Sequence, residues 1–209
     1  MKWSFIVVMA IISVLAFSCK KTSEEKPAAT PPDYYQLKVG NYWIYQGYSI
    51  DSNGVATAQN NFDSAHIEKD TIIRGNTYYK LWENELVQGK TQFPSYIRDS
   101  SGYLINNYGG RICSADDFTD TLGLDTTQLA LFKGYVKMTG KDSIVTVPAG
   151  NFQSITSRMK VVLTNPQFPH PVRYIYTVYG KNTGRIKSHG FYFDEYQQVE
   201  ARLVRYKVQ

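Results

Sequence analysis

Few residues in this 209-residue sequence have the types and spacing that chemistry at a protein site requires. His66 and Glu68 are two residues apart, so on a strand they would share one face and could hold a metal ion, but a metal site needs further ligands. Asp116, Asp117 and Asp120 offer the oxygen ligands that Ca²⁺ prefers, although their spacing matches no defined calcium loop. We predict that the His–Glu pair faces solvent and that the aspartates form a polar connection.

The sequence contains no pattern typical of a catalytic site. No glycine-rich phosphate loop precedes a helix, and no Gly-x-Ser-x-Gly nucleophile elbow occurs. The three histidines, His66, His170 and His189, are far apart in sequence, and apart from Glu68 beside His66 none has a second metal ligand at i+2. We therefore predict no catalytic residue, no bound metal, no cofactor and no enzymatic activity.

The first eighteen residues have the layout of a secretory signal. Lys2 supplies the positive charge, Phe5–Phe17 is an uncharged run of 13 residues, and small Ser18 follows it. A helix that spans a membrane needs about 20 apolar residues, so this run is too short to cross the membrane as a stable anchor. Residues 1–18 are predicted to be a signal peptide that is removed.

The segment Ala16-Phe17-Ser18-Cys19 resembles the lipobox of bacterial lipoproteins. This resemblance implies that the Cys19 thiol receives a diacylglyceryl group and that the chain is then cleaved before Cys19. An ordinary signal peptide with a chance cysteine is the alternative. The lipid would make the membrane a partner of the protein, and it predicts a lipid-anchored location in the cell envelope, at the outer membrane.

Residues 19–33 are predicted to be the lipidated cysteine and a disordered tether. After Cys19 the segment has no apolar residue larger than alanine, so it cannot bury enough surface to fold. Such a tether reaches about 20 Å on average. Ser23-Glu24-Glu25 resembles the acidic export signal of surface lipoproteins in Bacteroidota-type bacteria. The sequence leaves open whether the domain lies on the periplasmic or the surface face.

The remaining 176 residues, 34–209, fit a single domain. Because Cys19 is taken by lipid, Cys113 has no intramolecular disulfide partner and is predicted to be a buried thiol. The sequence pI is about 9.0, but Lys and Arg are scattered among Asp and Glu. Arg202, Arg205 and Lys207 are the one cluster, and a solvated strand edge accounts for them. No nucleic-acid partner is predicted.

Short aromatic runs with a period of two predict strands, and Gly-containing turn clusters such as Asp51–Gly54 separate them. We expect an all-β fold, an antiparallel meander that forms a strongly curved sheet or incomplete barrel, with at most one or two short helices. Thr126–Lys133 is the candidate helix. The side-chain pattern of the last strand changes parity near Leu203, which predicts a β-bulge there. The predicted strands lie at 41–50, 71–73, 77–82, 96–98, 103–105, 135–139, 143–147, 158–164, 172–179 and 199–208.

Four segments resemble recurrent sequence motifs of uncharacterised secreted β-rich lipoproteins of Bacteroidota-type bacteria. They are Leu37–Tyr45, Lys69–Leu81, Val147–Phe152 and the glycine-rich Tyr179–Lys187. The resemblance implies a fold and brings no catalytic residues with it. The residue types independently support this fold, because glycines in these segments lie where strands are predicted to end and the chain to reverse.

Two functions of different classes remain open. In the first, the concave face of the sheet, with Trp43, Tyr45, Tyr79 and Leu81, accepts an apolar or glycan ligand, although the same side chains could simply fill the core. In the second, the domain is a structural or interaction subunit that contacts another envelope protein. A hydrolase is a third reading. A water-accessible pocket among the aromatic residues would favour a ligand, and a filled interior would favour a scaffold.

Overall fold

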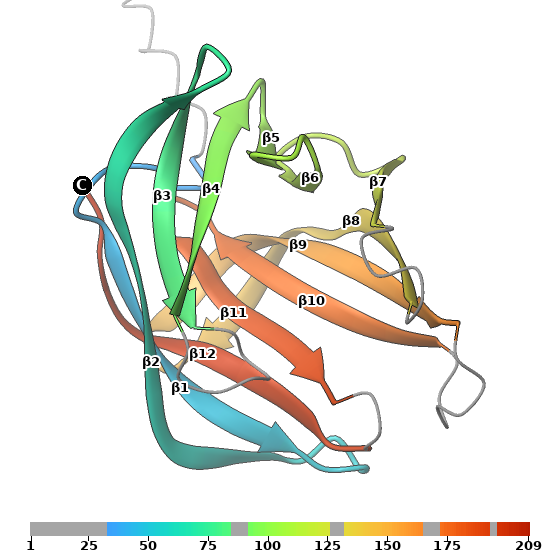
Figure 1. Ribbon diagram of the computed structural model, residues 1–209. Helices are drawn as coiled ribbons and strands as arrows, with labels where there is room; N and C mark the ends of the chain where they lie inside the picture. Colours follow the sequence, from blue (N-terminus) through green and yellow to red (C-terminus); the bar gives the residue numbers. More distant parts are fainter. Residues whose placement is uncertain (1–32, 85–91, 126–131, 165–171, 193–195) are drawn as a thin grey trace, which may run out of the picture. The chain divides into compact units, whose positions relative to one another are not determined.

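The computed structural model describes residues 33–84, 92–125, 132–164, 172–192 and 196–209. The chain divides into Met1–Pro31 and Pro32–Gln209, and all described residues belong to the second unit. The predicted signal peptide and nearly all of the predicted tether lie outside the described residues. The described part is all-β and contains no helix, as Figure 1 shows.

Twelve antiparallel strands form one sheet, so the predicted fold class is confirmed. The described residues contain no helix long and apolar enough to cross a membrane. The strands are β1 (Tyr42–Ile50), β2 (Ala56–Ile73), β3 (Asn76–Asn84), β4 (Gln92–Ser100), β5 (Tyr103–Asn106), β6 (Arg111–Ser114), β7 (Thr121–Asp125), β8 (Phe132–Val147), β9 (Gly150–Leu163), β10 (Val172–Gly180), β11 (Gly184–Phe191) and β12 (Gln198–Lys207).

Three of the sequence predictions need correction or remain untested. The two strands predicted at 135–139 and 143–147 are one strand, β8, because the chain bulges at 140–142 and continues instead of reversing. The strands β6, β7 and β11 were not predicted as strands. The candidate helix Thr126–Lys133 lies outside the described residues except for Phe132 and Lys133, which begin β8.

The strand order is β6-β5-β4-β3-β2-β1-β12-β11-β10-β9-β8-β7, so the first and last strands pair in the middle of the sheet. The two edges, β6 and β7, are neighbours in sequence. The sheet curls until β6 lies against β7, β8 and β9, but no ladder joins β6 to β7 among the described residues. The result is a barrel-shaped sheet with one open seam (Figure 1).

Bulges allow the sheet to curl this strongly, because each adds local twist to its strand. In the central pair, Ile44 lies opposite Arg205 and Tyr45 opposite Leu203, which leaves Val204 unpaired. This bulge confirms the one predicted near Leu203. A second register shift lies between Gln46 and Tyr48 on the other side of β1.

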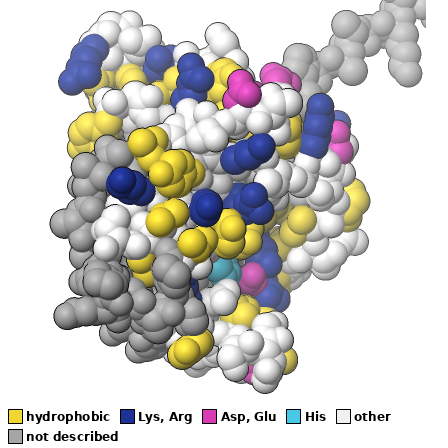
Figure 2. Space-filling view, turned by 90° about the vertical axis from the view of Figure 1, so that its right-hand side faces the viewer, with side chains coloured by type: hydrophobic (Ala, Val, Ile, Leu, Met, Phe, Trp, Pro, Cys, Tyr) yellow, Lys and Arg dark blue, Asp and Glu magenta, His cyan; other side chains and the backbone are white. Residues whose placement is uncertain are grey.

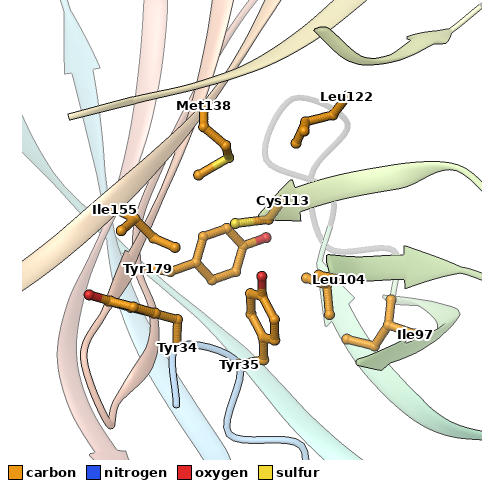
Figure 3. Packing of buried hydrophobic residues seen from close by; sticks show 9 residues of the cluster. All are labelled: Tyr34, Tyr35, Ile97, Leu104, Cys113, Leu122, Met138, Ile155 and Tyr179. Atoms are coloured by element: carbon orange, nitrogen blue, oxygen red, sulfur yellow. The ribbon is translucent and has the colours of Figure 1, made fainter. Parts of the chain in front are cut away.

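Buried side chains bridge the seam and replace the missing ladder. Tyr35 and Tyr179 meet edge to face, with ring centres 6.0 Å apart, beside Cys113 and Met138 (Figure 3). Cys113 is fully buried, as predicted, and burial raises the pKa of its thiol to about 12. The thiol is therefore protonated at neutral pH and is a poor nucleophile.

Two polar contacts also cross the seam. The Ser157 hydroxyl of β9 donates a hydrogen bond to the Ile112 carbonyl of β6 at 2.6 Å. The Ser114 amide of β6 faces the sulfur of Met138 in β8 at 3.3 Å. These contacts hold the edge strand β6 without extending the sheet across the seam.

The indole of Trp43 fixes the end of β1 against the β10–β11 turn. Its Nε1–H donates to the Thr183 carbonyl at 2.6 Å. Gly184 lies beneath the ring with φ of +89°, and a Cβ on this residue would lie 2.9 Å from Cζ2 of Trp43. Gly184 is thus required both by its backbone conformation and by the close approach of the ring.

We predict that Gly184→Ala destabilises the domain more than Gly75→Ala. Gly75 also has a positive φ, +76°, but a Cβ there would meet nothing within 4 Å. The Gly75 variant should lose about 1–2 kcal/mol of unfolding free energy from backbone strain, and the Gly184 variant about 1–3 kcal/mol more from overpacking. Urea unfolding measures both; equal losses would show that Trp43 does not confine this position.

Candidate functional site

A cavity of about 470 Å³ lies within the curled sheet. Most of its wall is apolar, and side chains from both halves of the sheet contribute to it. The aliphatic part of the wall is formed by Leu37, Ala65, Ile67, Leu81, Ile97, Leu104 and Ile112, and the aromatic part by Tyr35, Trp43, Tyr45, Tyr96, Tyr108 and Tyr179.

An ion pair lies in the cavity wall. Glu83 of β3 and Arg185 of β11 are joined through Oε2 and Nη1, and both side chains are about three-quarters buried. Arg185 also lies over the Tyr45 ring, 5.0 Å from its centre. The Tyr45 hydroxyl donates to the Arg185 carbonyl at 3.0 Å. The guanidinium therefore has a carboxylate and an aromatic face as partners.

The surroundings of Arg185 keep its guanidinium protonated. Burial is the largest influence on the pKa of Arg185 and lowers it, but the Glu83 carboxylate, Tyr45 and Tyr179 together outweigh burial, so the pKa is raised. Burial also raises the pKa of the Tyr45 phenol, with Arg185 acting in the opposite direction. The wall thus carries one positive and one negative charge that compensate each other, and a neutral phenol.

The cavity opens beside β4 and the β5–β6 turn, where its lining residues are exposed. Tyr108, in that turn, is 87% exposed, and Pro94 of β4 is exposed as well. Asn106 shapes the turn, because its side-chain oxygen accepts the amides of Tyr108 and Gly110 at 3.0 and 2.8 Å. Ser95 also lines the cavity, and its buried hydroxyl has no partner among the described residues.

Three of the four residues predicted to bind a ligand line this cavity. Trp43 and Tyr45 are 4% and 2% exposed, so they belong to the core and to the cavity wall at once, and Leu81 lies beside them. Tyr79 packs against the same core but faces a separate depression, next to Arg98. Their role as ligand contacts remains a prediction.

Sequence reasoning did not identify the polar members of the site. Glu83 and Arg185 are 102 residues apart, and neither lies in a catalytic motif or in one of the predicted strands. Ser95 likewise has no motif around it. The one available signal was parity, because Glu83 lies two residues after Leu81, which was predicted to face inward; its pairing with buried Ala65 shows that Glu83 does point inward.

The residue pairs that suggested metal chemistry have other partners. Glu68 binds Lys80 at 2.7 Å and accepts the indole N–H of Trp82. The hydrogen bond from Lys80 is the largest cause that lowers the pKa of the Glu68 carboxyl. The described residues contain no group of three or more His, Cys, Asp or Glu placed to hold a metal ion.

The aspartates lie in the connection between β6 and β7. The Asp117 carboxylate accepts the backbone amides of Thr119 and Asp120, both at 3.2 Å, and the Tyr103 hydroxyl at 3.2 Å. The hydrogen bond from the Asp120 amide is the largest cause that lowers the pKa of Asp117. Asp117 thus organises a polar connection, as the sequence suggested.

The sequence matches no protein-family model and no curated protein. Two solved structures have a similar fold. One is described as an exported protein with a YmcC-like fold from Bacteroides fragilis, with a TM-score of 0.50, 13% identity, and coverage of 83% of this chain and 98% of that one. The other is described as a lipoprotein from Parabacteroides distasonis, with a TM-score of 0.48, 10% identity, and coverage of 84% and 99%.

Proposed function

We propose that this chain is a lipid-anchored cell-envelope protein whose β domain binds a neutral, mainly apolar small molecule in the internal cavity without changing it chemically. The cavity carries this proposal. Its volume of about 470 Å³ lies within the range of about 300–1,000 Å³ that is typical of ligand sites. Its wall is largely apolar with a few polar groups, which is the usual composition of such a site.

The charges of the cavity favour a neutral ligand. Arg185 is compensated by Glu83, so a carboxylate that approached the guanidinium would also meet the carboxylate of Glu83. Burying an unpaired charge is costly. The Ser95 hydroxyl offers one hydrogen bond to a hydroxyl or carbonyl group of the ligand. A neutral molecule with a single polar group suits these contacts better than a fatty acid.

The location rests on the N-terminal sequence. The resemblance of Ala16–Cys19 to a lipobox and the secretory layout of residues 1–18 support export and lipid attachment. The Bacteroides fragilis protein with a similar fold is described as exported, which supports export of this chain. An apolar ligand also suits a protein held near a membrane, because such molecules are poorly soluble in water.

We predict that filling the cavity abolishes binding of a neutral apolar probe. Ala65 is buried in the cavity wall, so Ala65→Phe should occupy the space that a ligand would take. The probe is N-phenyl-1-naphthylamine, whose binding to the unit Pro32–Gln209 is followed by energy transfer from tryptophan. The variant should weaken binding at least about ten-fold, equivalent to about 1.4 kcal/mol.

Ala58→Phe is the matched control, because Ala58 lies on the same strand and is exposed. It should bind the probe as the unmodified domain does, and circular dichroism checks that both variants keep the fold. Ser95→Leu fills the cavity from β4, two strands along the sheet from β2, and should also weaken binding. Probe binding that persists in both filled variants would contradict a ligand in this cavity. Dodecanoate should compete poorly, because of the charge of its carboxylate.

The anchor gives a second prediction. Cys19→Ala in the full-length chain, expressed in a bacterium with an outer membrane, should block lipid transfer and leave an uncleaved precursor, because the thiol is the acceptor. Cys113→Ala, the control, should be processed normally, because Cys113 is buried in the domain. Mass measurement of the N-terminus after membrane fractionation distinguishes the products. A membrane-bound, signal-free protein with an unmodified Cys19 would show that something else holds it.

A further inference from the structure

The outward faces of β8, β9 and β10 form a regular grid of nine side chains. Strand pairing places them in three rows, each with one residue from every strand. Strand spacing and rise give the grid a size of about 10 by 14 Å. The rows are Lys133, Val162 and Val172; Tyr135, Lys160 and Tyr174; and Lys137, Arg158 and Tyr176. We call these nine residues the cationic face.

The cationic face carries four positive charges and no negative charge. Lys133, Lys137 and Lys160 are exposed and Arg158 is half-buried. Lys137 lies directly opposite Arg158, a like-charge pair that destabilises a sheet. None of the four forms an ion pair among the described residues. Such a face is complementary to an anion.

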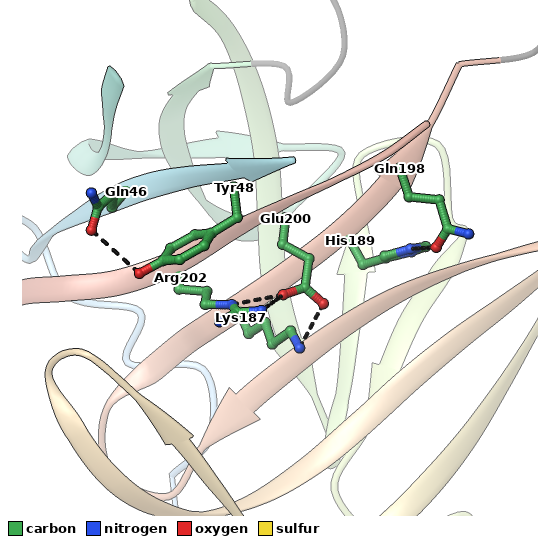
Figure 4. A network of polar contacts seen from close by, with 7 residues as sticks. All are labelled: Gln46, Tyr48, Lys187, His189, Gln198, Glu200 and Arg202. Carbon is green, nitrogen blue, oxygen red and sulfur yellow. Dashed lines mark hydrogen bonds and ion pairs between the residues drawn. The ribbon is translucent and has the colours of Figure 1, made fainter. Parts of the chain in front are cut away.

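The surrounding sequence does not neutralise this charge. Residues 126–180 contain a single acidic residue, Asp142, against six Lys and Arg. Glu200 on β12, which is separated from β10 by β11, already binds Lys187 and Arg202, each at 2.6 Å (Figure 4). Strand pairing therefore brings together cations that are scattered in the sequence. This finding corrects the expectation that the last strand holds the one basic cluster.

Tyrosine rings are interleaved with the cations. Tyr174 and Tyr176 lie nearly parallel, at 27°, with ring centres 6.4 Å apart, and the Arg158 guanidinium lies 5.1 Å from the Tyr174 ring centre. Tyr135 is exposed on the neighbouring strand. Figure 2, which views the side toward which β8, β9 and β10 extend in Figure 1, shows Lys and Arg side chains among side chains of the hydrophobic class, in which tyrosine is included.

A depression of about 330 Å³ adjoins the cationic face, and Arg173 and several neutral hydrogen-bonding groups line it. Tyr174 and Tyr176 form one side of it, and His189 and Gln198 form another. Nε2 of His189 lies 2.6 Å from Oε1 of Gln198, and the His189 ring meets Tyr176 edge to face. Burial lowers the pKa of His189, so the imidazole is neutral at neutral pH.

We propose that the cationic face and the adjoining depression bind an acidic oligosaccharide, whose sugars carry carboxylate or phosphate groups. The C–H face of a sugar ring packs on an aromatic ring, its hydroxyls pair with groups such as His189 and Gln198, and its acidic groups pair with lysine and arginine. A hollow lined by hydrogen-bonding side chains suits a discrete ligand better than it suits a flat membrane surface. This site is on the outside of the sheet and is independent of the internal cavity.

Calorimetry with the full-length protein in a polyoxyethylene detergent tests the proposal, with hexagalacturonate as the probe and maltohexaose as its neutral counterpart. Lys137→Gln combined with Lys160→Gln should weaken hexagalacturonate binding about ten-fold, which corresponds to about 1.4 kcal/mol. Tyr174→Ala keeps the charge but removes the stacking ring, and it should weaken binding to a similar extent. Tyr174→Phe should bind normally. Maltohexaose should not bind.

Matched variants separate a site from general attraction. Lys69→Gln combined with Lys181→Gln removes the same charge from exposed positions elsewhere, and Tyr206→Ala removes an exposed tyrosine of β12, outside the face. Both should change affinity less than about two-fold, because they leave the grid intact. Equal weakening by the two lysine pairs, or normal binding by Tyr174→Ala, would overturn the proposal. If the protein binds dihexanoylphosphatidylglycerol but does not bind hexagalacturonate, the proposal would also be overturned. That result would indicate that the cationic face binds a lipid surface.

Discussion

The pairing of β1 with β12 is the constraint on which the rest of the structure depends. It joins the two ends of the domain in the middle of the sheet, so it closes nearly the whole length of the domain and carries the largest loop-closure cost of any strand pair. The bulge at Val204 sets its register and directs Tyr45 and Leu203 into the interior. A shift of one residue would turn both side chains to solvent. This register therefore determines which side chains form the core, the cavity wall and the outer face.

The open seam and the cavity follow from the same arrangement. Because the ends of the domain are central, the sheet edges are strands from the middle of the chain, β6 and β7, and the polar connection around Asp117 turns the chain between them. Tyr35, Cys113 and Tyr179 pack across the seam, yet the interior beside them stays open as far as Arg185. The sheet thereby separates two environments. The interior is mainly apolar and its charges are paired, whereas the cationic face on the outside carries positive charges that none of the described acidic residues pairs with.

Local features of the fold could be predicted from the sequence, and long-range ones could not. The turns at Gly54 and Gly75 were evident, because glycine favours the positive φ that they adopt. Gly140 and Asp142 looked like a similar turn, but they form a bulge within β8, since pairing with β9 continues on both sides. The pairing of Glu83 with Arg185, and the gathering of cations on three strands, depend on register between distant segments. No local pattern encodes that register.

Hydrogen exchange of the ligand-free domain tests the central claim, that the sheet is closed by β1 and β12 and open between β6 and β7. Amides paired between Tyr42–Ile50 and Gln198–Lys207 should exchange only on global unfolding. Amides of Arg111–Ser114 and Thr121–Asp125 that face the seam should exchange at least about a hundred-fold faster, because they lack a ladder partner. Equal protection of the two regions would show that β6 and β7 pair in solution, and would contradict the open seam.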